Sequence, residues 1–473
     1  FFGENMLRAD VCNAVEELGQ LLDHNGAIGE SERNAARIFN ADHCFFVTNG
    51  TSTSNKMVWH HTVAPGDVVV VDRNCHKSIL HSIIMTGAIP VFMKPTRNHF
   101  GIIGPIPQSE FEPATIQAKI KANPLLKGVD AKKVKPRVLT LTQSTYDGVL
   151  YNTETIKGML DGYVDNLHFD EAWLPHAAFH PFYGTYHAMG KKRTRPKYSV
   201  TYATQSIHKL LAGISQASHV LVQDSQTTKL DHHLFNEAYL MHTSTSPQYS
   251  IIASCDVAAA MMEPPGGTAL VEESIKEALD FRRAMKKVAK EYGKDWWFKV
   301  WGPDKVGSES VAQPDGWVLK ANEKWHGFGN LAEGFNMLDP IKSTIITPGL
   351  DVSGKFAKTG IPASIVTNGG FASGTNAAWT ATGAVWPAAW TVVARGGAAP
   401  QSTAPAPFMA RLPTGGGAVQ AVNQAVEAAA GDRFSASFFY AAAGASRNVT
   451  LLGYVRALDL NGGSLGTFPM GQI

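Results

Sequence analysis

Two ionisable residues stand at the carboxyl ends of apolar segments of the chain. Lys209 comes after the predicted strand Tyr198–Ala203 and before the small and apolar run Leu210–Ser215. Burial depresses the pKa of an amine and frees its lone pair for attack on a carbonyl, so Lys209 is a candidate covalent catalyst. Asp170 ends a second apolar run, Leu167–Phe169. Taken alone, each has an ordinary structural explanation, because lysine is mostly a surface residue and aspartate is common in turns.

Together, the lysine and the aspartate match the needs of one cofactor. Pyridoxal phosphate requires an amine for its aldehyde and a carboxylate for its pyridinium nitrogen. A third feature is the turn Gly50–Thr53, which follows the predicted strand Cys44–Thr48 and opens a predicted helix. Free backbone N–H groups and the helix dipole favour an anion there, so the turn is a candidate phosphate cradle. The alternative is an ordinary helix N-cap, which is the commoner role of such a turn.

Seven apolar segments must position these side chains, and we predict them as strands of one sheet. Runs of Val and Leu without polar alternation are typical of strands covered on both faces, and the spacings leave room for crossover helices. The sequence therefore predicts an α/β fold with a mainly parallel sheet, in which ligands bind at the carboxyl ends of the strands. The segments are Cys44–Thr48, Asp67–Asp72, Ile89–Met93, Arg137–Leu141, Asn166–Asp170, Val200–Tyr202 and His219–Val222.

Composition narrows the classes of protein. A chain of 473 residues can bury a large core and is expected to hold two or three domains. Its net charge of +2 supplies no strong field for nucleic acid or an anionic membrane. The four cysteines are scattered without a CxxC pair, which argues against structural zinc and a disulfide scaffold and favours a reducing, cytoplasmic setting. We expect no signal peptide and no membrane span, since no stretch reaches the ~18–20 apolar residues that a span needs.

Five motifs occur in one order along the chain: Asn74–Ser78, Ser144–Gly148, His168–Trp173, Ser206–Lys209 and Phe235–Tyr239. With them the chain resembles the bacterial ornithine/lysine/arginine decarboxylases, which are pyridoxal-phosphate enzymes of fold type I. The resemblance covers about residues 1–367. It implies decarboxylation of a basic amino acid to a diamine or to agmatine. The segments Asn98–Ile102 and Leu150–Thr153 look most like those of lysine decarboxylases.

The resemblance implies a role for each matched site residue. Lys209 binds the cofactor and yields it to the substrate amine, Asp170 pairs with the pyridinium N–H, and His76 stacks on the ring. His208 is either a proton donor or a neighbour of the phosphate, or else makes only a structural hydrogen bond. The implied cofactor-binding residues are Thr51, Ser52, His76, Asp170, Ala172, Trp173, Ser206, His208, Lys209 and Ser244. Of these, Thr51, Ser52 and Ser206 hold the phosphate, and Ser244 reaches it from a neighbouring subunit.

The resemblance also implies a domain organisation. A large pyridoxal-phosphate-binding domain is expected over residues 1–264, and the beginning of a smaller α+β decarboxylase domain over 265–367. Residues 368–473 do not match the family; they are rich in Ala and Gly and contain no lysine or histidine. Family members usually carry a further wing domain before the point where this chain begins. A cytoplasmic homodimer or larger homo-oligomer, with a role in polyamine metabolism or acid stress, is expected by resemblance.

Three alternatives remain open at this point. The segment Phe169–Ala172 also resembles the metal-binding strand of a nucleotide hydrolase, but such an enzyme needs a GxxxxGK[ST] loop, which the sequence lacks. A transaminase would use the same lysine and aspartate and differ in its product. A truncated, catalytically impaired homologue would bind the cofactor and self-associate without releasing carbon dioxide.

Overall fold

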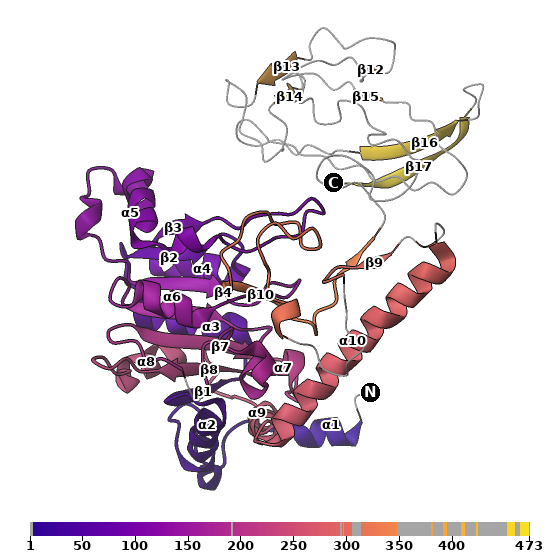
Figure 1. The fold of residues 1–473 in the computed structure, drawn as a ribbon. Coiled ribbons are helices and arrows are strands. Elements are labelled where there is room, and N and C mark those ends of the chain that lie inside the picture. The colour runs from indigo at the N-terminus through magenta and orange to yellow at the C-terminus, as the bar shows by residue number, and fades with distance from the viewer. Residues whose placement is uncertain are drawn as a thin grey trace. The chain divides into compact units, whose positions relative to one another are not determined.

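The computed structural model describes residues 3–190, 193–293, 296, 298–304 and 314–347, together with short strands between 380 and 472. The chain divides into two compact units, residues 1–359 and 360–473. The described strands of the second unit form antiparallel pairs (Figure 1): β12 with β15, β13 with β14, and β16 with β17. They are β12 Thr380–Ala381, β13 Thr391–Ala394, β14 Phe408–Arg411, β15 Val422–Asn423, β16 Leu452–Leu458 and β17 Ser464–Gln472. The rest of the segment 368–473, which we expected not to match the family, lies outside the described residues.

The first unit is built on a seven-stranded sheet with the order β1-β8-β7-β6-β4-β2-β3 (Figure 1). The strand β8 is antiparallel to both of its neighbours, and the other six strands share one direction. The strands are β1 His43–Val47, β2 Val68–Asp72, β3 Ile89–Met93, β4 Val138–Thr142, β6 Asn166–Asp170, β7 Val200–Ser206 and β8 Ser218–Gln223. The seven predicted strands and the mainly parallel sheet are therefore confirmed. The strand β7 continues past its predicted end to Ser206 and so leads directly into the Ser206–Lys209 motif.

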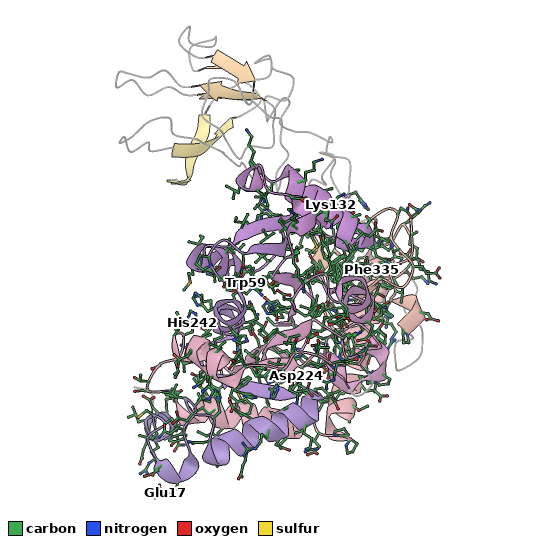
Figure 2. All side chains as sticks on the ribbon, turned by 90° about the vertical axis from the view of Figure 1, so that its left-hand side faces the viewer. Glu17, Trp59, Lys132, Asp224, His242 and Phe335 are labelled. Atoms are coloured by element: carbon green, nitrogen blue, oxygen red, sulfur yellow. The ribbon has the colours of Figure 1, made fainter. Side chains whose placement is uncertain are left out.

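Both faces of the sheet are covered, which explains the apolar runs. In β2, Val68 and Val70 belong to one buried cluster, whereas Val69 and Val71 belong to another. Successive residues of a strand point to opposite faces, so the two clusters lie on the two sides of the sheet. The second cluster includes Trp59, labelled in Figure 2, which is fully buried. Trp59 belongs to α3 (Thr51–Thr62), so this helix covers that face together with α4 (Lys77–Thr86).

Two small strand pairs organise the later part of the first unit, one joining it to the earlier part and one lying within it. The strand β10 pairs with β5, and β11 pairs with β9. In α10, the buried Arg282 donates hydrogen bonds to the carbonyls of Trp301, Pro340 and Lys342, which fastens this helix to the same segment. The elements are α1 Glu4–Ala9, α2 Gly26–Phe39, α5 Pro113–Ala122, α6 Thr153–Leu160, α7 Ile207–Leu210, α8 His232–Leu240, α9 Tyr249–Met261, α10 Gly266–Tyr292, β5 Val149–Tyr151, β9 Lys299–Val300, β10 Asn336–Leu338 and β11 Ile345–Ile346. The expected domain boundary after residue 264 stays a prediction. Within the described part of the chain, none of the helices has the length and apolar character that crossing a membrane requires.

Candidate active site

The start of helix α3 and the end of strand β7 meet at one edge of the sheet. The hydroxyl oxygens of Thr51 and Ser206 lie 2.6 Å apart, and both residues are buried. Gly50 turns the chain from β1 into α3 with a φ of 73°, a backbone conformation that glycine adopts without strain. A Cβ added to Gly50 would lie 4.0 Å from Cε1 of His208, so this histidine flanks the same turn. Two hydroxyls and an imidazole thus surround the free N–H groups of a 12-residue helix, which is an environment that favours an anion.

Asp170, the last residue of β6, is buried with a hydrogen-bond donor on each carboxylate oxygen. Its Oδ1 accepts from the N–H of Ala172 at 3.1 Å, and its Oδ2 accepts from Nδ2 of Asn55 at 2.8 Å. Burial raises the pKa of Asp170, and this shift is opposed by the two donors and by the charges of His76 and Lys209. A buried carboxyl group with donors on both oxygens is suited to hold its negative charge.

His76 is the N-cap of helix α4 and lies half-buried after strand β2. Its Nδ1 accepts a hydrogen bond from the backbone N–H of Ser78 at 3.2 Å and lies 2.8 Å from the Ser78 hydroxyl. Burial lowers the pKa of His76, whereas the charge of Asp170 opposes that shift. The cap occupies Nδ1 and leaves Nε2 for another partner. This capping contact is therefore compatible with a role of His76 in the site.

Lys209 lies on the short helix α7 and is half-buried, less enclosed than its apolar surroundings in the sequence suggested. Its Nζ is 4.4 Å from the centroid of the Trp173 ring. Tyr146 packs edge-on against the same ring, with centroids 5.6 Å apart. Burial lowers the pKa of Lys209, and the nearby Asp170 carboxylate partly opposes this. Trp173 is thus part of the wall beside the lysine rather than filler of the core.

A buried ionic cluster holds Trp173 in place. Lys342 donates from Nζ to the Trp173 carbonyl at 2.7 Å and to Oδ2 of Asp339 at 2.7 Å. Asp339 also accepts from the Tyr183 hydroxyl at 2.9 Å, and its Oδ2 is 3.3 Å from Nε2 of His176. Burial alone would raise the pKa of Asp339, but the charges of Lys342 and His176 outweigh it and hold the pKa well below the usual range. The segment around Asp339 therefore supports the site from a distance.

Two of the expected cofactor-binding residues, Ser52 and Ser244, are exposed to solvent. Ser52 is exposed in the first turn of α3. Ser244 is also exposed, and its hydroxyl accepts a hydrogen bond from the N–H of Ser246 at 3.1 Å. His208 donates from Nδ1 to the carbonyl of Ala217 at 2.9 Å, which is the structural hydrogen bond considered above and which leaves Nε2 free of that contact. The structure thus brings Thr51, Ser206 and His208 together, while Ser244 stands apart on the surface.

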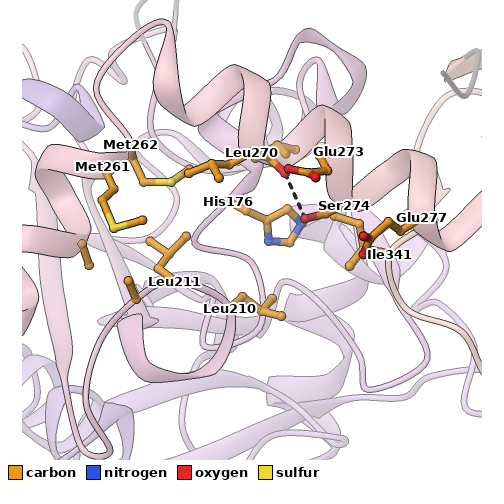
Figure 3. Close-up of a pocket in the computed structure, with 13 residues that line it drawn as sticks. His176, Leu210, Leu211, Met261, Met262, Leu270, Glu273, Ser274, Glu277 and Ile341 are labelled. Atoms are coloured by element: carbon orange, nitrogen blue, oxygen red, sulfur yellow. Dashed lines mark hydrogen bonds between the residues drawn. The ribbon is translucent and has the colours of Figure 1, made fainter. Parts of the chain in front are cut away.

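A cavity of about 390 Å³ lies beside these groups rather than at them. Figure 3 shows Leu210 and Leu211, which follow Lys209, facing Met261 and Leu270 across it. Neither Lys209 nor Asp170 lines this cavity. Catalysis with a phosphorylated cofactor requires groups that ionise or bind an anion. We therefore place the candidate active site where Lys209, Asp170 and the start of α3 converge, rather than in this cavity.

Sequence reasoning missed three residues that the structure places beside the site. Asn55 and Ser78 connect Asp170 with His76, and Tyr146 packs on Trp173. Asn55 lies one helical turn after Thr51 and therefore on the same face of α3, which was the available signal. Tyr146 belongs to the Ser144–Gly148 motif, but its partner could not be inferred from spacing.

The comparisons with known proteins agree with this geometry. Residues 1–371 match the family model described as Orn/Lys/Arg decarboxylase, major domain. Lysine decarboxylase LdcA of Pseudomonas aeruginosa is 56% identical over 368 residues, which are 77% of this chain and 48% of that protein. The biodegradative arginine decarboxylase of Escherichia coli strain K12 is 43% identical over 384 residues, covering 78% of this chain and 50% of that protein.

A solved structure shows the same relationship. Lysine decarboxylase A from Pseudomonas aeruginosa is 54% identical and superposes with a TM-score of 0.71, covering 79% of this chain and 50% of that chain. The present chain spans about half the length of these relatives. Fold, motifs and relatives agree: the chain belongs to the ornithine/lysine/arginine decarboxylase family and has the fold-type-I α/β architecture of its major domain.

Proposed function

We propose that this chain catalyses the pyridoxal-phosphate-dependent decarboxylation of a basic amino acid, with lysine favoured over arginine and ornithine. One observation carries the proposal: the Lys209 amine, the Asp170 carboxylate with its two donors and the anion-binding start of α3 converge at one edge of the sheet. The names of the relatives, which include lysine and arginine decarboxylases, support the reaction and the preference for lysine.

The chemistry of the donor groups fits pyridoxal phosphate. The hydroxyls of Thr51 and Ser206 and the first N–H groups of α3 suit its phosphate, with Ser52 as a further donor on the exposed side. Asp170 suits the pyridinium N–H, while His76 and Ala172 lie beside Asp170 where they can flank the ring. When bound, the cofactor supplies an electron sink for the pair of electrons that the Cα–carboxylate bond releases.

The ionisable residues of the chain then have distinct tasks. Lys209 binds the cofactor aldehyde, and its lowered pKa increases the fraction of the neutral, nucleophilic amine. Asp170, with a donor on each carboxylate oxygen, would hold a proton on the ring nitrogen. His208, beside Gly50, is assigned to the phosphate, since its ring faces the same turn as Thr51. Lys209 is consequently the group that we assign to return a proton to Cα. Trp173 excludes water from one side of the lysine.

We further propose that the active form is a cytoplasmic homodimer or a larger homo-oligomer. Ser244 is exposed here, as a serine that completes a neighbouring subunit's site must be in a single chain. Apolar residues are also exposed around α9: Ile214 at 49%, Val257 at 52% and Met261 at 44%. A hydrogen bond from the Ile214 N–H to the Ser254 hydroxyl places Ile214 beside α9, and a second copy of the chain would cover these apolar side chains.

Product analysis tests the function. The purified chain is incubated with pyridoxal phosphate and, separately, with lysine, ornithine and arginine, and diamine or agmatine is quantified. The matched pair of variants is Lys209→Ala, which removes the proposed catalyst, and Lys276→Ala, which removes an exposed lysine of α10. Product from the wild type and from Lys276→Ala, but not from Lys209→Ala, would support the proposal. Cofactor absorption without any product would favour the impaired homologue, and absence of both would refute the assignment of the site.

A further inference from the structure

Both N–H groups and the oxygen of the Asn55 side-chain amide form hydrogen bonds in the space between α3 and the sheet. Its Nδ2 donates to Oδ2 of Asp170 at 2.8 Å and to the Ser78 hydroxyl at 3.0 Å. Its Oδ1 accepts from the Thr204 hydroxyl at 2.6 Å. Asn55 is 1% exposed, so water cannot replace any of these partners without a rearrangement of the fold.

A chain of buried hydrogen bonds leads from the far end of α3 to this amide. Trp59 donates from Nε1 to the Thr140 hydroxyl at 3.2 Å, and Thr140 lies 3.3 Å from Nδ1 of His168. On the other side of the imidazole, Nε2 of His168 is 3.0 Å from the Thr204 hydroxyl. All four residues are fully buried.

The chemistry of these groups permits one direction of donation. The Asp170 carboxylate only accepts, so Nδ2 of Asn55 faces it and Oδ1 of Asn55 accepts from the Thr204 hydroxyl. Thr204 has then given its one hydrogen away and accepts from Nε2 of His168. Burial lowers the pKa of His168 to about 3, so its ring is neutral, with one accepting and one donating nitrogen. Because Nε2 of the neutral imidazole donates, its Nδ1 accepts from the Thr140 hydroxyl, which in turn accepts from the indole N–H of Trp59.

We infer that Asn55 is a positioning residue, which holds the Asp170 carboxylate in register with the cofactor ring, and that the Trp59–Thr140–His168–Thr204 chain supplies the donor that the oxygen of its amide needs in that orientation. The inference rests on the proposed function, because Asp170 is assigned there to the ring nitrogen. A flipped amide would turn its carbonyl toward the carboxylate and its NH₂ away from it. Two acceptors would then face each other in a buried space, which is strongly unfavourable.

The second N–H of Asn55 connects its amide, through Ser78, to His76, the residue that is expected to stack on the ring. Because the Ser78 hydroxyl accepts from Asn55, its own hydrogen is directed to Nδ1 of His76, 2.8 Å away. Nδ1 of His76 is then an acceptor, and the proton of the neutral ring is on Nε2. The backbone N–H of Ser78 makes the same demand on Nδ1, so the Asn55 amide agrees with the tautomer that the helix cap requires.

The first test measures the apo-protein and needs no turnover. Asn55→Ala removes the amide, and Ser54→Ala is the matched control, since Ser54 is the adjacent buried residue of α3 and bonds to Ser218 rather than to Asp170. Asp170 is also faced by Asp72, Cys75, His76 and Lys209, which are unchanged in both variants. Unfolding midpoints in urea are recorded as a function of pH.

The sign of the pH effect follows from Asp170. Burial raises the pKa of Asp170 in the folded state, so ionisation of this carboxyl destabilises the fold as pH rises through that pKa. Loss of Asn55 raises the folded-state pKa further, so the deficit of Asn55→Ala relative to wild type should grow with rising pH. The deficit of Ser54→Ala should be independent of pH. Parallel pH profiles for the two variants would overturn the inference whether or not the chain is a decarboxylase.

The second test uses the cofactor and a variant of nearly unchanged shape. Asn55→Asp keeps the acceptor for Thr204 but replaces the donor by a second carboxyl next to Asp170. We expect the dissociation constant of pyridoxal phosphate to rise about 10- to 100-fold at neutral pH, and to recover at lower pH, where the two carboxyls share a proton that restores a donor. Ser54→Ala should bind the cofactor as the wild type does. An unchanged dissociation constant for Asn55→Asp, with a wild type that binds and turns over, would overturn the inference and leave the proposed function intact.

Discussion

The buried contact between Lys342 and Asp339 leads to the sharpest prediction about stability. The substitution Lys342→Met keeps an unbranched apolar side chain but removes both the hydrogen bond to the Trp173 carbonyl and the charge beside Asp339. The side chains of Lys342 and Asp339 are 8% and 0% exposed, so solvent cannot compensate for the loss. Removing one partner of a buried ion pair costs about 3–5 kcal/mol, and we expect a loss of that size at neutral pH.

The pH dependence separates this cause from a simple loss of packing. In the wild type the pKa of Asp339 is held well below its usual range, so the carboxylate stabilises the fold at all pH values above its unfolded-state pKa. Without Lys342 the folded-state pKa rises, and Asp339 becomes protonated as the pH falls. The difference in unfolding free energy between variant and wild type should therefore shrink toward low pH.

The assay is equilibrium unfolding in urea at several pH values, with Lys276→Met on the exposed side of α10 as the control. The control should stay within about 0.5 kcal/mol of the wild type. A loss below about 1 kcal/mol for Lys342→Met, or a loss that is the same at every pH, would show that the pair is not the support that we describe.

Three further predictions concern the site and the core. Asp170→Ala should retain some cofactor binding but lose most of the turnover, because no carboxylate then holds the ring proton; near-normal kcat would count against its assignment. Ser206→Ala should raise the dissociation constant of the cofactor about tenfold through loss of a hydroxyl near the anion, as measured by equilibrium dialysis, and an unchanged constant would move the phosphate away from α3. Leu139→Ala, at a fully buried position of β4, should lower the unfolding free energy by about 2–5 kcal/mol in urea titrations, and a smaller loss would mean that the core closes over the cavity.

The sheet could be predicted from the sequence because the residue types of each strand reflect the burial of its two faces. A strand such as β2, with alternate valines in two different clusters, is apolar throughout only because both faces are covered, and this is visible in a single line of sequence. Lys209 and Asp170 were likewise visible, since each stands at or just beyond the end of an apolar run. Local pattern is sufficient for the strands, but for these two residues it also fits a surface lysine and a turn aspartate, so their role in the site stays a prediction.

The supports of the site could not be predicted in the same way. Asn55 meets Thr204, and Lys342 meets Trp173, across large separations in the chain. No periodicity links such residues, because each partner lies on a different element and they meet only when the sheet order is known. The exposure of Lys209 was also misjudged. Its neighbours in sequence are apolar, but they do not bury its side chain, because the short helix α7 lies just past the carboxyl end of β7.

The contact between Lys342 and the Trp173 carbonyl has a consequence for the order in which the protein is made. Every strand of the large sheet ends at or before Gln223, so a growing chain holds all residues of the sheet before Lys342 has been synthesised. Asp339, which anchors the amine, is made only three residues before Lys342. The hydrogen bond that fixes Trp173 beside Lys209 can therefore form only after the residues of the whole sheet have been made.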